Sequence, residues 1–264
     1  APFASVLPCD SPVRNAERFH MSAEWAKVPL ACGGSLRFAP AGSAAGPSGC
    51  RLWASSIALC GALHTRSAQF SGKRAIDLGA GTGLAGLFAA TAGCAQVTLT
   101  DANDDALRLL RGNVRRFELA DAITAGQLHV ESLDFARHQD VTAFGVFELV
   151  LTSECVYLRE HAVQLMAAID NLLAQGGFVL LANRDRPLPG LKVREQLCLE
   201  AAQRGLDVEE LDAQGCFRTG LSLLGVTEDM ITGCVDDHTF MACLSRRSDQ
   251  LDSGIPGCQL NEMD

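Results

Sequence analysis

The chain has 264 residues with a formal net charge of −9, and 48% of its residues are hydrophobic. This length can bury the core of one domain, and we expect one domain with additional terminal segments. The acidic balance excludes a protein that holds nucleic acid mainly through its phosphates, and it is compatible with a basic peptide or protein substrate. No apolar run approaches the roughly 20 residues of a membrane span, and we find no charged-then-apolar secretory leader. We therefore expect no membrane partner.

Residues 1–50 are rich in Pro, Ala, Gly and Ser, which predicts a flexible N-terminal extension or a long hairpin loop with a short strand at Ser35–Phe38. From Arg51 an apolar helical stripe leads to an alternation of strands and helices. Strands are predicted at 73–78, 96–100, 128–131, 147–152, 178–182, 206–211 and 239–244. Helices are predicted at 84–92, 104–117, 159–174 and 193–204, and Gln175–Gly177 is expected to stop the third of them. We place one domain at 51–247 and a polar tail at 248–264.

Seven strands with interleaved helices predict an α/β fold with a doubly wound sheet. Ligands of such sheets bind beyond the carboxyl ends of the strands, where the strand order reverses. This rule brings the segments after the first, second and fourth predicted strands to one edge.

A glycine-rich turn follows the first predicted strand directly. Gly79, Gly81 and Gly83 let the backbone pass close under a ligand, and the next helix offers free N–H groups to a carboxylate or phosphate. Asp101 ends the second strand about twenty residues later, where an acid can accept hydrogen bonds from both hydroxyls of a ribose. Together these residues predict a nucleoside-containing cofactor.

The identity of the cofactor depends on the turn itself. Gly81–Gly86 also satisfies the dinucleotide pattern G-x-G-x-x-G, which alone is weak evidence for NAD. The acidic Asp77 just inside the turn and the D-x-G-x-G-x-G spacing favour S-adenosylmethionine. A tight turn without a ligand is the remaining alternative, and Asp101 at the end of the next strand disfavours it.

A second group of polar residues follows the fourth strand in the segment Leu151–Tyr157. Glu154 and Tyr157 are three residues apart and are expected near the methyl end of a bound cofactor, so they are the candidate catalytic residues. The alternative is that Glu154 caps the following helix while Tyr157 packs. Tyr157 is the only tyrosine of the chain.

With these motifs, the segment from Arg51 to Arg247 resembles the seven-strand S-adenosylmethionine-dependent protein methyltransferases that include calmodulin-, elongation-factor- and chaperone-modifying lysine enzymes. The further matching residues are Trp53 on the helix expected before the first strand, Asp101, the pair Asn113 and Val114, and the element Leu133, Asp134 and Phe135. The resemblance implies a Rossmann-like class I methyltransferase sheet whose last strand is antiparallel. It also implies a protein substrate, and we expect a monomer. The implied cofactor contacts are Trp53, Asp77, Gly79, Ala80, Gly81, Gly83, Asp101, Asp134, Phe135 and Ser153.

Two residues depart from the family pattern. Phe135 replaces the usual tryptophan, which keeps an aromatic face but loses the indole N–H donor. Glu154 replaces the aspartate of the D-x-x-Y motif, which puts lysine specificity in question. The Thr-Ser-Glu-x-x-Tyr version, together with Asp101-x-Asn103, resembles the protein-histidine methyltransferase branch. The acceptor is therefore expected to be a protein side-chain nitrogen, and both lysine and histidine stay open.

Methyl transfer is a direct displacement, so the main task of the protein is to align a nitrogen lone pair with the methyl–sulfur bond. A lysine, with a pKa of about 10.4, must first lose its proton, whereas a histidine near 6.5 is mostly neutral. Glu154 can hold the acceptor or stabilise the proton that it releases, and Tyr157 can orient the acceptor through its hydroxyl.

Other classes of function need residues that are missing from 153–157. A nucleic-acid amino methyltransferase needs an Asn/Asp-Pro-Pro-aromatic turn there, and a catechol-type enzyme needs clustered acidic ligands. A cofactor-binding module without turnover, a methyltransferase for a small molecule and a NAD-dependent dehydrogenase stay as alternatives.

The eleven cysteines are scattered, and no two form a C-x-x-C pair. Most have apolar neighbours, where cysteine acts as a small hydrophobe. This predicts free thiols in a reducing compartment, so we expect a cytoplasmic protein, with the nucleus as a second compartment. Neither the cysteines nor the six histidines have the spacing of a zinc site, and we expect no metal.

Overall fold

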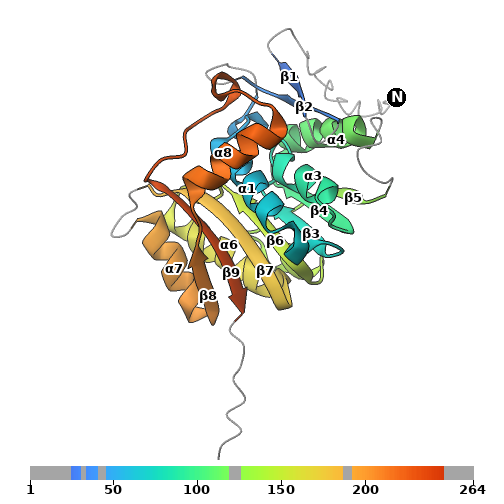
Figure 1. Ribbon diagram of the computed structural model, residues 1–264. Helices are drawn as coiled ribbons and strands as arrows, with labels where there is room; N and C mark the ends of the chain where they lie inside the picture. The colour runs from blue at the N-terminus through green and yellow to red at the C-terminus, as the bar shows by residue number, and fades with distance from the viewer. Residues whose placement is uncertain (1–24, 31–33, 41–45, 119–125, 187–191, 247–264) are drawn as a thin grey trace, which may run out of the picture.

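The computed structural model describes residues 25–30, 34–40, 46–118, 126–186 and 192–246 (Figure 1). Their largest sheet has seven strands in the order β5-β4-β3-β6-β7-β9-β8. The strands are β3 (Arg74–Leu78), β4 (Gln96–Asp101), β5 (Leu128–Ser132), β6 (Phe147–Ser153), β7 (Leu173–Arg184), β8 (Leu206–Glu210) and β9 (Thr239–Arg246). Neighbouring strands from β5 to β7 pair in parallel, whereas β9 is antiparallel to both β7 and β8. The predicted α/β class and the antiparallel last strand are confirmed.

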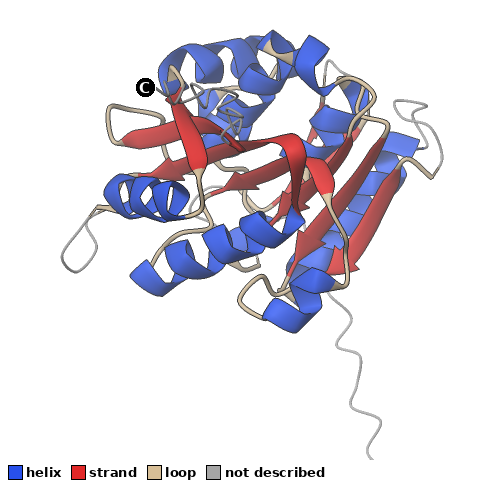
Figure 2. Ribbon diagram, turned by 90° about the horizontal axis from the view of Figure 1, so that it is seen from below, coloured by secondary structure: helices blue, strands red, loops and turns tan. Residues whose placement is uncertain are grey.

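Helices cover both faces of this sheet (Figures 1 and 2). They are α1 (Ala54–Thr65), α2 (Ser67–Phe70), α3 (Leu84–Thr91), α4 (Asp104–Glu118), α5 (His138–Thr142), α6 (Arg159–Leu172), α7 (Val193–Gln203) and α8 (Ala213–Leu224), with short 3₁₀ helices η1 (Ser48–Cys50) and η2 (Glu228–Met230). Successive side chains of a strand point to opposite faces. Leu149 and Leu151 of β6 accordingly join the core under α1, α3, α4 and α8, while Val150 joins the core under α5, α6 and α7.

A hairpin of β1 (Ala26–Pro29) and β2 (Ser35–Phe38) lies outside the large sheet and contains the predicted strand at 35–38. It packs on α4, where Leu36 and Phe38 are buried in the same core as Phe117. The backbone N–H of Arg37 donates to Oδ1 of Asn113 at 2.9 Å, and Nδ2 of Asn113 donates back to the carbonyl of Arg37 at 3.0 Å. Part of the segment 1–50 is therefore packed against the α/β fold. The predicted tail from residue 248 lies outside the described residues.

α8 was not predicted, and glycine is unfavourable in the interior of a helix. The structure gives the glycines of α8 a reason. A Cβ at Gly220 of α8 would collide with the carbonyl of Ile57, and a Cβ at Gly61 of α1 would collide with the carbonyl of Cys216. The two helices therefore pack backbone against backbone, which only glycine permits at such positions.

α6 ends two residues earlier than predicted, at Leu172, and the residues Gln175–Gly177 belong to the extended strand β7. The guanidinium of Arg246 explains this early end. It donates to the carbonyl of Asp170 at 2.7 Å and to that of Leu173 at 3.3 Å. These side-chain donors satisfy carbonyls that a longer helix would have used.

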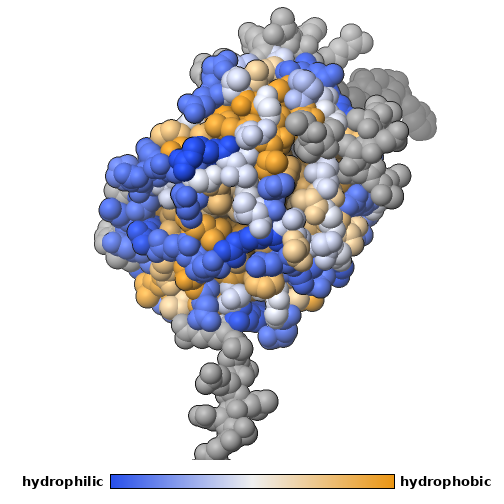
Figure 3. Space-filling model, viewed as in Figure 1, coloured by the Kyte–Doolittle hydropathy of each residue, from blue (hydrophilic) through white to orange (hydrophobic). Residues whose placement is uncertain are grey.

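On the face seen in Figure 3, hydrophilic residues are interspersed with hydrophobic ones. None of the helices in the described ranges is long and apolar enough to cross a membrane.

Candidate active site

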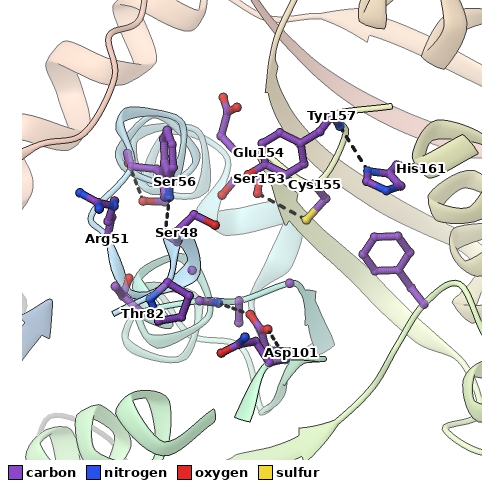
Figure 4. Close-up of a pocket in the computed structure, with 18 residues that line it drawn as sticks. Ser48, Arg51, Ser56, Thr82, Asp101, Ser153, Glu154, Cys155, Tyr157 and His161 are labelled. Atoms are coloured by element: carbon purple, nitrogen blue, oxygen red, sulfur yellow. Dashed lines mark hydrogen bonds between the residues drawn. The ribbon is translucent and has the colours of Figure 1, made fainter. Parts of the chain in front are cut away.

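A pocket of about 280 Å³ opens at the carboxyl ends of β3, β4 and β6. Asp101 lies on one side of it, and Glu154 and Tyr157 lie on the other (Figure 4). Nine of the predicted site residues line it, namely Trp53, Gly79, Ala80, Gly81, Asp101, Phe135, Ser153, Glu154 and Tyr157. The fold therefore brings most of the predicted cofactor and catalytic residues to one cavity.

The glycine turn after β3 forms the floor of this pocket. Gly79 and Gly81 have φ angles of +65° and +55°, which side chains rarely adopt. A Cβ at Gly81 would lie 2.5 Å from the carbonyl oxygen of Gly49, in the segment before α1. The backbone N–H of Ala80 donates to the carbonyl of Thr100 at 2.7 Å, which attaches the turn to β4. The turn is thus held between two backbone segments with no room for a side chain.

Asp101 at the end of β4 is fastened to the same turn. Its Oδ2 accepts a hydrogen bond from the N–H of Gly81 at 3.0 Å, and its Oδ1 accepts one from the N–H of Asn103 at 2.9 Å. Burial raises the pKa of Asp101, while these backbone donors lower it. Each carboxylate oxygen has a second lone pair, so Asp101 can also accept hydrogen bonds from two hydroxyls of a ligand.

Three predicted cofactor residues do not line the pocket. Asp77 is buried behind the turn, where its Oδ2 accepts from the N–H of Gly86 at 3.0 Å in the first turn of α3. Desolvation raises its pKa to about 7. At Gly83 a Cβ would collide with the side chain of Leu110, so this glycine serves helix packing. Asp134 lies in the loop after β5 and accepts from the N–H of Ala136 at 3.0 Å.

Two aromatic side chains contribute walls of the pocket. Trp53 is the residue before α1 rather than a residue of that helix. Its Nε1 donates to the carbonyl of Ser48 at 3.0 Å, which holds the segment before α1 over the pocket. Phe135 follows β5 and is the aromatic residue that the sequence analysis assigned to the cofactor. Phe135 has no indole N–H. The indole N–H of Trp53 does not take its place, because it already donates to the carbonyl of Ser48.

Glu154 is the one residue other than glycine with a positive φ in the described part of the chain, at +53°. Its Oε1 accepts from Oγ of Ser55 at 2.5 Å and from the N–H of Arg184 at 2.9 Å. Its Oε2 accepts from Nη2 of Arg186 at 2.5 Å. The residue that caps α6 is Leu158, without a side-chain bond, so the alternative of a helix-capping Glu154 is wrong. The carboxylate is instead buried in a network of protein donors.

Tyr157 stands beside this network and is 43% exposed. The guanidinium carbon of Arg186 lies 4.7 Å from the centre of its ring, and the ring of His161 meets it edge-on at 6.3 Å. Partial burial and the neighbouring Cys155 and Glu154 raise the pKa of Tyr157 to about 12. The phenol is therefore protonated at neutral pH and can both donate and accept a hydrogen bond.

The sequence analysis missed several residues of the pocket wall, namely Pro47, Ser48, Gly49, Arg51, Ser56, Thr82, Cys155 and His161. His161 lies in the first turn of α6, close to Tyr157 in the sequence, and this proximity is the signal that could have found it. Residues 47–49 carry no such signal. A backbone bond from the N–H of Ala39 to the carbonyl of Cys50, at 2.8 Å, places them.

Within the described residues, no three His, Cys, Asp or Glu side chains are grouped as ligands of a metal ion. All eight cysteines of these ranges are free thiols, as the sequence analysis expected of the cysteines. Burial raises the pKa of Cys155, which lines the pocket, to about 12, so this thiol stays protonated at neutral pH.

A sequence model described as lysine methyltransferase matches residues 38–201, more than half of the chain. The chain belongs to the lysine methyltransferase family. The protein N-lysine methyltransferase METTL21A of Danio rerio is 35% identical over 138 residues, which cover 51% of this chain and 60% of that relative. EEF1A lysine methyltransferase 3 of Mus musculus is 32% identical over 164 residues, which cover 60% of this chain and 68% of that relative. The chain thus spans between three fifths and seven tenths of the length of these two relatives.

Solved structures support the fold. A SAM-dependent methyltransferase from Streptococcus mutans has a TM-score of 0.54 at 12% identity, covering 84% of this chain and 56% of that one. Magnesium protoporphyrin IX methyltransferase from Synechocystis, solved with bound SAM, has a TM-score of 0.52 at 13% identity, covering 74% of this chain and 79% of that one. The predicted family, class I methyltransferase fold and S-adenosylmethionine cofactor class are confirmed.

Proposed function

We propose that this chain transfers the methyl group of S-adenosylmethionine to the side-chain nitrogen of a lysine in a protein substrate. The observation that carries this proposal is one pocket lined by both the glycine turn with Asp101 and the segment from Ser153 to Tyr157. The first group suits a nucleoside cofactor, and the second suits an amine acceptor. The names of two relatives, which modify protein lysines, support the choice of acceptor.

The residues of the pocket fit the cofactor. The backbone at Gly79 and Gly81 forms the floor without side chains, since a Cβ there would collide with Cys155 or Gly49, and the Asp101 carboxylate is placed to accept from ribose hydroxyls. Trp53 and Phe135 offer aromatic faces to the same pocket. The cavity of about 280 Å³ is close to the lower end of the roughly 300–1,000 Å³ of small-ligand sites.

When bound, S-adenosylmethionine supplies a methyl group on a positively charged sulfur. The acceptor lysine must reach it as a neutral amine, and a buried, positively charged surrounding favours the loss of its proton. The hydroxyl of Tyr157 is neutral at physiological pH and can accept a hydrogen bond from the amine N–H. Such a bond leaves the nitrogen lone pair free to point into the pocket. Tyr157 is thus the residue that we assign to orienting the acceptor.

Glu154 has a different role in this proposal from the one the sequence suggested. Because its oxygens already accept three hydrogen bonds from Ser55, Arg184 and Arg186, the carboxylate is a poor direct ligand for the acceptor. We assign it to holding the segment that carries Tyr157.

The experiment incubates the purified protein with methyl-labelled cofactor, together with elongation factor 1A, calmodulin and a cell lysate in separate reactions. We expect the label on a protein lysine, located by mass spectrometry of the digested band. The Asp101→Ala variant, with its weakened cofactor site, should leave the same band unlabelled. Label only in nucleic acid or in small molecules would contradict the proposal.

The pH profile separates lysine from histidine as acceptor. A lysine acceptor gives a rate that rises toward pH 9, because more of the amine is neutral there. A histidine acceptor gives a rate that levels off near neutrality. A plateau near neutral pH, with the label on an imidazole ring, would move the proposal to histidine.

A further inference from the structure

The guanidinium of Arg186 joins three parts of the acceptor side of the pocket. Its Nη2 donates to Oε2 of Glu154 at 2.5 Å, and its Nη1 donates to the carbonyl of Val156 at 3.0 Å. Its carbon lies 4.7 Å from the centre of the Tyr157 ring. One planar group thus contacts a carboxylate, a peptide carbonyl and an aromatic face of the same segment, 154–157.

We propose that Arg186 is the positioning residue that sets the orientation of Tyr157 and thereby of the acceptor nitrogen. This inference rests on the proposed function, because it names the residue that acts through Tyr157. Arg186 lies just after β7, outside the motifs of the sequence analysis, and it does not line the pocket itself.

The segment 154–157 needs such support. Glu154 holds a positive φ of +53°, a strained conformation for a residue other than glycine. Asn183 and Arg186 both donate to the carbonyl of Val156, at 3.2 Å and 3.0 Å. Asn183 also accepts from the N–H of Val156 at 3.0 Å, so it fixes the backbone of the segment. Arg186 alone among these contacts reaches the Tyr157 ring.

A guanidinium suits this place better than an ammonium would. Its flat fork donates two hydrogen bonds in one plane while its face stacks on an aromatic ring. A lysine at position 186 keeps the charge but offers a point donor, which can satisfy Glu154 or Val156 and cannot stack in the same way.

The test compares Arg186→Met with Arg194→Met. Arg194 is a matched control, since its guanidinium also pairs with a carboxylate, Glu210, and lies over an aromatic ring, Phe240, at 5.9 Å. Arg186→Met should lower kcat about tenfold or more while the Kd of the cofactor changes less than about twofold, because alignment of the acceptor is lost and the cofactor floor is intact. Arg194→Met should leave both values unchanged. The kcat of Arg186→Lys should lie between those of wild type and Arg186→Met.

Because Tyr157 is the only tyrosine, carbon-13 labelling of tyrosine rings gives NMR signals from this residue alone. These signals should move in Arg186→Met and stay in place in Arg194→Met. Unchanged kcat and unchanged tyrosine signals in Arg186→Met would overturn the proposal, as would a loss of cofactor affinity as large as the loss of kcat. If Arg186→Met does not fold, the Arg186→Lys variant decides by the same readouts. If the wild type methylates no protein, the proposed function fails, while the tyrosine signals still test the link between Arg186 and Tyr157.

Discussion

Asp101 ends β4 and Asp134 lies in the loop after β5, and only Asp101 of these two acidic residues lines the pocket. We expect Asp101→Ala to weaken cofactor binding by about tenfold to a hundredfold, since a charge-assisted contact of roughly 1.5–3 kcal/mol is lost. Asp134→Ala should leave the affinity unchanged. Calorimetric titration of both variants with S-adenosylhomocysteine checks this. Equal losses of cofactor affinity in the two variants would mean that Asp134 also contributes to the cofactor site.

Glu154→Gln should lower kcat, on the order of a hundredfold, and change the cofactor Kd by less than about threefold. The amide can keep the oxygen that accepts from Ser55 and Arg184, but it then turns an N–H donor toward Arg186. Steady-state kinetics and cofactor titration measure the two effects separately.

Glu200→Gln is the matched control for this change. Glu200 is 6% exposed, as Glu154 is, and it pairs with Arg204 at 2.5 Å on α7, away from the pocket. The Glu200→Gln substitution weakens this ion pair, so it should lower the stability of the protein with little change in kcat. If kcat falls in both variants in proportion to their loss of stability, Glu154 acts only through stability.

The sequence predicted Glu154 and Tyr157 as a pair but could not predict the partners of Glu154. Ser55 is 99 positions away along the chain, and Arg186 is 32 positions away. Such partners meet only when α1 and the end of β7 reach the same edge of the sheet. The chemistry of a residue type can be predicted locally, whereas its hydrogen-bond partners depend on the tertiary fold.

At the scale of elements, the turn between β3 and α3 shows how close backbone packing shapes the site. Gly81→Ala should weaken cofactor binding tenfold or more and lower the melting temperature by several degrees, because its Cβ would meet the carbonyl of Gly49 at 2.5 Å. Gly72→Ala is the control. Gly72 has a φ of +75° and open space around it, so it carries the same backbone penalty without the collision. Similar affinities in the two variants would show that the close approach to Gly49 is unimportant.

The strands and most helices of the α/β core were predictable because their apolar patterns are long and the connections are short. α8 was not, although Asp212 accepts a hydrogen bond from the N–H of Gly215 at 2.9 Å as an N-cap, and Gly225 ends the helix with a φ of +67°. These end signals were present in the sequence. The interior glycines are unfavourable in a helix, and local propensity cannot anticipate that α1 and α8 pack against each other through glycines on both helices.

At the scale of the whole molecule, the buried Asp77 makes stability depend on pH. Its pKa in the folded protein, about 7, lies above the ordinary value of 3.8, so unfolding releases a proton between these values. Its contribution to stability is therefore full below about pH 4 and is lost as the pH rises through 7, with a slope of at most about 1.4 kcal/mol per pH unit.

The Asp77→Asn variant tests this, because an asparagine can still accept the hydrogen bond from Gly86. Relative to wild type, the variant should gain stability between pH 5 and pH 8, measured by urea unfolding at each pH. A difference in the free energy of unfolding that is the same at pH 5 and pH 8 would show that Asp77 does not titrate in this range.

The position of β9 has a consequence for how the chain folds during synthesis. β9 comes last of the seven strands in the sequence, yet it lies inside the sheet between β7 and β8. Until residues 239–246 have left the ribosome, β8 has no neighbouring strand and β7 has an open edge, which is the kind of edge that pairs with other chains. The nascent protein therefore carries one unpaired strand, β8, and one open strand edge, on β7, through the synthesis of α8 and η2.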